Sequence, residues 1–140
     1  MQKWEGAAAV CVNDQGELLM VLQGTTEEAK RWSVPSGGRE SGETLEACCL
    51  RELHEETGYS GDIIRALHEK NNSINGYDVT VQYFEVKVVG GKMTIQDPDE
   101  LIYEIAWQSA DKIEHLDLSF PEDRKFLMDY IHEQKISRTE

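Results

Sequence analysis

Three glutamates lie close together in the segment with the clearest helical pattern, residues 43–57: Glu52, Glu55 and Glu56. At about 100° per residue, they share one sector of that helix with an apolar stripe. The stripe consists of Leu45, Cys48 and Cys49. Carboxylates that continue a core-facing stripe repel one another and are costly to desolvate. A solvated acidic helix end is the alternative, and the sector shared with the cysteines argues against it.

A cation is therefore expected beside these carboxylates. Arg51 supplies one positive charge at helical i, i+4 spacing from Glu55, which is too little for three carboxylates. A hard divalent cation with oxygen ligands is sufficient, and Mg²⁺ suits a few carboxylates together with water and substrate phosphates. The acidic residues do not follow the spacing of a calcium-binding loop.

The overall charge is strongly acidic, with 14 Lys+Arg against 27 Asp+Glu and a net charge of −13. Residues 39–56 hold six acids and two bases, and residues 97–104 hold four acids and no base. Each of these segments therefore contributes −4, and together they account for −8 of the −13. The acidity argues against a nucleic-acid duplex or an anionic membrane surface as partner. It remains compatible with a small anionic substrate held through a cation.

The length of 140 residues fits one domain, residues 1–140, and no repeat or linker divides it. The three cysteines, Cys11, Cys48 and Cys49, form neither a disulfide framework nor a CxxC metal site. Buried cysteines in a reducing compartment are expected. No apolar run approaches the ~20 residues that span a membrane, and none resembles a signal peptide. A cytoplasmic protein is predicted.

The elements that position the helix are predominantly strands. A hairpin is predicted over residues 6–22, around the turn cluster at 13–16. A long strand is predicted at 79–89 with a partner at 92–96, and another strand at 102–108. Residues 60–70 are ambiguous, with a strand as one possibility. Ser41 or Gly42 is expected to cap the central helix, and a second helix follows residues 119–123. The pattern favours a mixed sheet with helices packed on it, an α/β (α+β) class.

Around the glutamates, the sequence resembles the Nudix box, whose pattern is G-x5-E-x7-R-E-U-x-E-E-x-G-U with U bulky and apolar. Gly37, Glu43 and the run from Arg51 to Tyr59 match eight of its nine specified positions outright. Tyr59 departs in type but is bulky. Trp32 to Pro35 before the box and Trp107 after it are similar to the family too. Ser36 stands where the family usually has glycine.

The resemblance implies a Nudix fold, with a mixed β-sheet sandwiched between helices (α/β/α) and the box at residues 37–59. It also implies hydrolysis of a nucleoside diphosphate linked to another moiety, with a nucleoside triphosphate or derivative favoured here. Water would attack one phosphorus of a P–O–P bond with the help of Mg²⁺ or Mn²⁺. The expected partner is thus a small nucleotide.

Carried over by position, the resemblance assigns the metal ligands to Glu52, Glu55, Glu56 and the backbone carbonyl of Ser36. One of the glutamates could act as the base instead. Arg51 would orient a box glutamate, and Glu43 would tie the loop to the helix. Gly37 and Gly58 would permit backbone turns that a Cβ resists.

Further site candidates lie outside the core of the box. The acidic cluster contains Asp97, Asp99, Glu100 and Glu104. It is either a solvated loop or the source of a further metal ligand or a general base. Glu104 is preferred over Glu100, because the resemblance implies a glutamate in this region before a late strand. Arg39, Glu40 and Trp32 are the candidate substrate-binding residues.

Two other functions compete with a hydrolase. A non-catalytic, regulatory Nudix-like module would bind a nucleotide, but such modules usually lack box glutamates that are all present here. An isoprenyl diphosphate isomerase of the same fold is disfavoured because no cysteine lies in an obvious catalytic setting. Neither the particular nucleotide nor the oligomeric state follows from the sequence.

Overall fold

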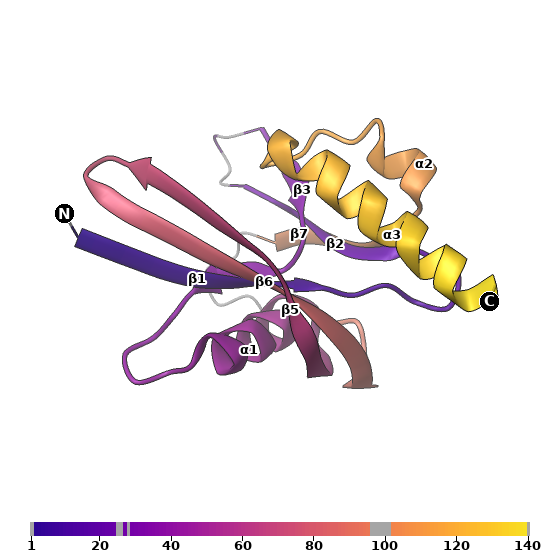
Figure 1. The fold of residues 1–140 in the computed structure, drawn as a ribbon, viewed down its shortest axis with the longest axis horizontal. Helices are drawn as coiled ribbons and strands as arrows, with labels where there is room; N and C mark the ends of the chain where they lie inside the picture. Colours follow the sequence, from indigo (N-terminus) through magenta and orange to yellow (C-terminus); the bar gives the residue numbers. More distant parts are fainter. Residues whose placement is uncertain (1, 25–26, 28, 96–101, 140) are drawn as a thin grey trace.

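The computed structural model describes residues 2–24, 27, 29–95 and 102–139, which form two β-sheets between helices (Figure 1). The first sheet has the order β4-β1-β6-β5, in which β1 and β6 are parallel and the other pairs antiparallel. Its strands are β1 (Gln2–Val10), β4 (Ser36–Gly38), β5 (Tyr59–Ile74) and β6 (Tyr77–Gly91). The second sheet, β3-β2-β7, is antiparallel. It consists of β2 (Leu18–Gln23), β3 (Arg31–Ser33) and β7 (Ile102–Gln108).

The helices cover the two opposite faces of these sheets. They are α1 (Leu45–Thr57), α2 (Ala110–Ile113) and α3 (Arg124–Thr139), with the 3-10 turn η1 (Pro121–Asp123) before α3. One core joins Cys48, Cys49 and Leu53 of α1 to both sheets. A second core joins Leu127 and Ile131 of α3 to the other side of both sheets. The α/β/α arrangement and the mixed class are therefore confirmed, with two sheets in the place of one.

The predicted hairpin over residues 6–22 is present only next to its turn and is wrong for the rest of the two strands. β1 and β2 pair only at the turn, through an isolated bridge between Val12 and Leu18, and then enter different sheets. β1 runs between β4 and β6, and β2 runs between β3 and β7. Alternating residues of β1 contribute to both cores, Ala7 and Ala9 to one and Ala8 and Val10 to the other. A strand that is buried on both faces has a continuous apolar sequence whether it pairs with β2 or with β4 and β6. The periodicity of the sequence therefore could not identify its partner.

The long strand at 79–89 is confirmed as part of β6, but its predicted partner is wrong over residues 92–95, which form no strand; Gln96 lies outside the described residues. β6 instead pairs with β5, which settles the ambiguous residues 60–70 as a strand. Gly91 has φ +78°, and a Cβ there would lie 2.3 Å from the Gly58 carbonyl oxygen. The chain turns there toward the end of α1, where the Thr94 N–H donates to the Thr57 carbonyl. The strand at 102–108 and the C-terminal helix are present as predicted.

The hairpin of β5 and β6 projects beyond the helices together with the start of β1 (Figure 1). The three cysteines are free and buried, as expected. No helix in the described part of the chain is long and apolar enough to cross a membrane.

Leu53 anchors α1 to the sheet, because its side chain is fully buried in the first core. Replacing it with alanine removes buried methyl groups and leaves a cavity, so L53A is expected to lower the free energy of unfolding by about 2–5 kcal/mol. Urea unfolding followed by circular dichroism measures this change. The neighbouring exposed residue provides the control, and H54A is expected to change stability by about 0.5 kcal/mol or less. Equal effects of the two substitutions would contradict this packing.

Candidate active site at the box helix

The box begins in β4, crosses a short loop and continues through α1. Thr44 caps the helix, and its hydroxyl oxygen accepts a hydrogen bond from the Ala47 N–H at 3.0 Å. The predicted caps, Ser41 and Gly42, are therefore wrong by two to three residues, and Glu43 precedes the helix. Gly58 ends α1 in the left-handed region, at φ +83°. A Cβ on Gly58 would lie 2.3 Å from the Lys92 carbonyl oxygen, which explains the glycine at this box position.

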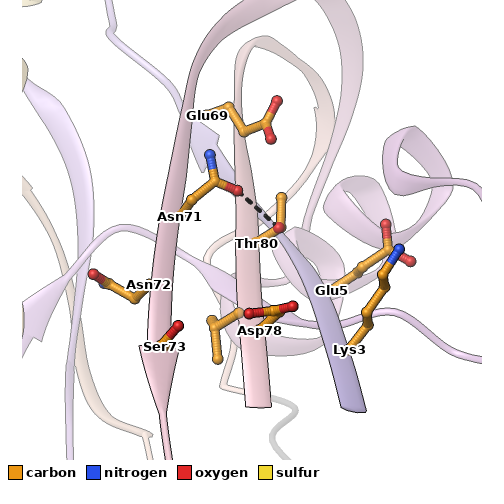
Figure 2. Close-up of a pocket in the computed structure, with 9 residues that line it drawn as sticks. Lys3, Glu5, Glu69, Asn71, Asn72, Ser73, Asp78 and Thr80 are labelled. Carbon is orange, nitrogen blue, oxygen red and sulfur yellow. Dashed lines mark hydrogen bonds between the residues drawn. The ribbon is translucent and has the colours of Figure 1, made fainter. Parts of the chain in front are cut away.

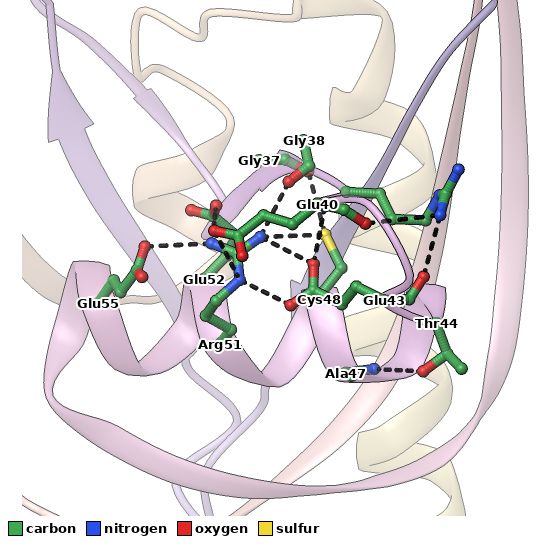
Figure 3. A network of polar contacts seen from close by, with 11 residues as sticks. Gly37, Gly38, Glu40, Glu43, Thr44, Ala47, Cys48, Arg51, Glu52 and Glu55 are labelled. Carbon is green, nitrogen blue, oxygen red and sulfur yellow. Dashed lines mark hydrogen bonds and ion pairs between the residues drawn. The ribbon is translucent and has the colours of Figure 1, made fainter.

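Arg51 is the centre of the polar network at the box (Figure 3). Its guanidinium donates to both carboxylate oxygens of Glu43, at 2.7 and 3.0 Å. Nη1 donates to Glu52 at 2.8 Å and to Glu55 at 3.3 Å, and Nη2 donates to the Gly38 carbonyl at 2.9 Å. This side chain therefore joins the loop, the end of β4 and two box carboxylates. The fork geometry of arginine suits such multiple contacts, which a lysine could not reproduce.

The bidentate contact also fixes the charge state of the pair. The hydrogen bonds from Arg51 hold the pKa of Glu43 at about 2, well below its ordinary value, and the Glu40 N–H adds to the effect. The same contact raises the pKa of Arg51. Both groups are therefore charged at neutral pH. This one positive charge is shared among the carboxylates of Glu43, Glu52 and Glu55.

Glu52 and Glu56, one helical turn apart, lie against β4. A Cβ on Gly37 would lie 2.3 Å from Cδ of Glu52, so the carboxylate occupies the space that this glycine leaves open. The Ser36 N–H donates to Oε1 of Glu56 at 3.4 Å, and Glu56 is only 6% exposed. Glu55 is more open, with 39% of its side chain exposed.

The oxygen donors beside β4 have the chemistry of a magnesium or manganese site. They are the carboxylates of Glu52 and Glu56 and the backbone of Ser36 and Gly37, and hard oxygen ligands are what these cations prefer. Within the described ranges, no three His, Cys, Asp or Glu side chains converge as a metal site requires. Glu52 and Glu55 turn toward Arg51, whereas Glu56 turns toward Ser36. The metal-ligand set predicted from the box therefore stays a prediction.

The other predicted site residues lie apart from this group or at its rim. Arg39 contacts Glu5 and the Glu43 carbonyl, and Glu40 is exposed 3.7 Å from Arg51. Trp32 lies in β3 and packs against the second core, away from the box carboxylates.

Glu104 lies in β7 opposite Leu22 with an exposed side chain, and none of its described contacts joins it to the box. Asp97, Asp99 and Glu100 lie outside the described residues. The assignment of a general base to this cluster is therefore still a prediction.

A cavity of about 580 Å³ opens beside β4, and sequence reasoning missed it. Ser36 and Gly37 of the box line it, together with Trp4, Lys70 and Tyr77. Its other lining residues are Ala7, Asn72, Ile74, Asn75, Val79, Val81, Tyr83, Phe120 and Glu122. The available signal was the alternation of apolar residues along 77–83, which marks one apolar sheet face, but the pairing with β1 and β5 was not evident.

Comparison with known proteins agrees with this fold. The family model described as NUDIX domain matches residues 3–130. The chain is similar to a NUDIX hydrolase structure from Nitrosomonas europaea, with 26% identity, a TM-score of 0.81 and coverage of 92% of this chain and 88% of the other. It is 31% identical over 100 residues to an 8-oxo-(d)GTP phosphatase of Mycolicibacterium smegmatis. It is 30% identical over 115 residues to the putative nudix hydrolase 1 of Caenorhabditis elegans.

These two curated relatives are considerably longer than the matched segment. The alignments cover 71% and 77% of this chain but only 30% and 31% of the relatives. The chain belongs to the NUDIX domain family, because the family model matches nearly all of its length.

The low pKa of Glu43 makes its contribution to stability dependent on pH. A carboxyl whose pKa falls from its ordinary value of 4.5 to about 2 on folding stabilises the protein above about pH 4.5. This contribution is lost as the pH falls from 4.5 toward 2. E43Q is therefore expected to be less stable than the unsubstituted chain at pH 7, with a difference that shrinks below pH 4.5. Urea unfolding between pH 7 and pH 3 measures the difference.

The control for this experiment is E46Q, which changes an exposed glutamate in the first turn of the same helix. As an exposed surface substitution, it is expected to change stability by about 0.5 kcal/mol or less at pH 7. A difference for E43Q that stays constant down to pH 3 would contradict the Arg51–Glu43 coupling.

Proposed function

We propose that this chain is a divalent-metal-dependent pyrophosphohydrolase that cleaves a P–O–P bond in a nucleoside diphosphate linked to another moiety. A nucleoside triphosphate or a derivative of it is the substrate class we favour. The observation that carries the proposal is the position of Glu52 and Glu56 against Gly37 and Ser36, which also line the cavity beside β4. Carboxylates for a cation and space for an organic group thus lie on either side of one strand.

In this proposal the box residues have separate tasks. Glu52, Glu56 and the Ser36 carbonyl hold Mg²⁺ or Mn²⁺, with Glu55 as a further ligand or the base. When bound, the cation neutralises the diphosphate and lowers the pKa of a water molecule. Arg51, fixed by Glu43, keeps the helix and the β4 loop in register, so that the carboxylates do not move apart.

Glu55 is our candidate for accepting a proton from the attacking water. It is the box carboxylate with the most open side chain, at 39% exposure against 16% for Glu52. A general base must reach water, and a carboxylate near the attacked phosphorus can take its proton. Glu104 is the second candidate.

The relatives support the reaction class. The Mycolicibacterium protein is named for phosphatase activity on 8-oxo-(d)GTP, and another relative, from Bacillus subtilis, is named ADP-ribose pyrophosphatase. Both named substrates contain a P–O–P bond. The three free, buried cysteines support the cytoplasmic location predicted from the sequence.

Substitution of the box glutamates tests the proposal. E52Q, E55Q and E56Q remove one negative charge each with little change in shape, so each is expected to lower kcat/KM by about 100-fold or more. The measurement is Mg²⁺-dependent release of nucleoside monophosphate, pyrophosphate or phosphate from a panel of nucleoside triphosphates. E46Q on the same helix serves as the control and is expected to retain activity. Near-normal turnover in all three box variants would refute the proposed function.

A further inference from the structure

The projecting part of the first sheet has two faces of opposite character. Residues that alternate along β5, β6 and β1 place Lys3, Glu5, Glu69, Asn71, Ser73, Asp78 and Thr80 along one face, which is polar (Figure 2). On the opposite face, Trp4, Val79 and Asn72 lie side by side across the three strands. Val81 and Lys70 form the neighbouring pair on this face. This second face is largely apolar and forms the wall of the cavity beside β4.

Large apolar side chains around this cavity are open to solvent. Trp4 is 41% exposed, and Tyr77, Ile74 and Phe120 are exposed to a similar degree. The cavity volume of about 580 Å³ lies within the range of small-molecule sites. Since Ser36 and Gly37 belong to both the cavity and the box, a ligand with its diphosphate at the box carboxylates can place its organic group here.

Trp4 supplies a flat aromatic wall with a fixed position. Its indole lies over Gly6 and Gly38, where a Cβ would come within 2.7 and 3.0 Å of the ring. Two glycines from neighbouring strands therefore provide the space for this ring. An indole that is rigid on one side and open on the other is a surface on which a nucleobase can stack.

Two charged residues that can bind a ligand, Lys70 and Glu122, line the cavity. Lys70 Nζ donates to Glu122 and to Asp123, each at 3.0 Å, and lies 4.4 Å from the centre of the Phe120 ring. The Tyr83 hydroxyl donates to the second oxygen of Asp123 at 2.5 Å. Asp123 is buried and engaged by two partners, whereas 54% of the Glu122 side chain is exposed. An ammonium has three N–H donors and a carboxylate has about four acceptor sites, so both Lys70 and Glu122 retain capacity for a ligand.

We infer that Lys70 and Glu122 select a guanine base in this cavity, with Trp4 as the surface on which the base stacks. The inference deepens the proposed function by naming the base of its substrate. Guanine carries two adjacent N–H groups beside a carbonyl oxygen. The Glu122 carboxylate accepts from both N–H groups, and Lys70 donates to the oxygen. Adenine presents a ring nitrogen without hydrogen where guanine has its N–H, so it leaves the carboxylate facing a lone pair.

Binding of nucleoside monophosphates to the whole chain tests this inference. These compounds have no P–O–P bond, so their binding is independent of the proposed hydrolysis. Calorimetric titration is expected to show GMP binding about tenfold or more tighter than AMP, which corresponds to a good bidentate contact. IMP, which lacks the 2-amino group of guanine, is expected to bind with intermediate affinity.

Variants at the wall identify the groups responsible. E122Q is expected to reduce the GMP-to-AMP preference to about threefold or less, because one of its two acceptor oxygens becomes an NH₂ donor. E69Q, on the polar face of β5 next to Lys70 in the chain, is the matched control and is expected to keep the preference. W4A is expected to weaken GMP and AMP alike by about tenfold, and W4F to retain most of the affinity.

The ratio of two affinities measured on one protein does not depend on the stability of the variant. Equal binding of GMP and AMP, or a preference that survives in E122Q, would overturn the inference even if the chain hydrolyses nucleotides. A guanine preference that E122Q abolishes would support it even if no hydrolysis is found.

Discussion

The structure depends on how four carboxylates are accommodated around one guanidinium. Glu40, Glu43, Glu52 and Glu55 all form ion pairs with Arg51 and together carry more negative charge than it can balance, and Arg51 gives its strongest contact to Glu43. That contact holds the loop to the helix, while Glu52 and Glu55 share the remaining donors of the same guanidinium. Such an excess of charge at the edge of a core is costly for the protein alone. In the proposed function, a divalent cation and an anionic substrate would offset this cost.

The fold places this charge where a substrate can reach it. β4 is a short edge strand, and its backbone touches Glu56 and Glu52 on one side and the cavity on the other. The strand is formed by Ser36, Gly37 and Gly38, and a side chain at Gly37 would displace Glu52 while one at Gly38 would press on Trp4. Small residues at these positions therefore serve both the carboxylate site and the aromatic wall. Because β1 and β2 are buried on both faces, each helix layer has its own core.

The sequence was sufficient for the parts of the site that depend on local spacing. The helix, its glutamates and Arg51 follow from a 3.6-residue period and a fixed motif, and the structure places Arg51, Glu52 and Glu55 within one network. The pairing of strands that are far apart in the chain was harder to predict from the sequence. The apolar run at 7–12 gave no sign that β1 pairs with β6 rather than β2, because both faces of the strand are buried. Trp32 is the aromatic residue that the sequence offers for substrate binding, but it packs against the second core. Trp4 lines the cavity and lies over two glycines, a position that depends on long-range strand register.

Anomalous diffraction from crystals grown with Mn²⁺ tests the central claim most directly, since it locates the cation without reference to activity. The account predicts one strong anomalous peak at the box, within about 2.3 Å of carboxylate oxygens of Glu52 and Glu56 and near the Ser36 carbonyl. It also predicts that Arg51 keeps its bidentate contact with Glu43 when the cation is bound. Manganese bound elsewhere in a protein that shows metal-dependent hydrolysis, with the box glutamates still turned toward Arg51, would contradict the account.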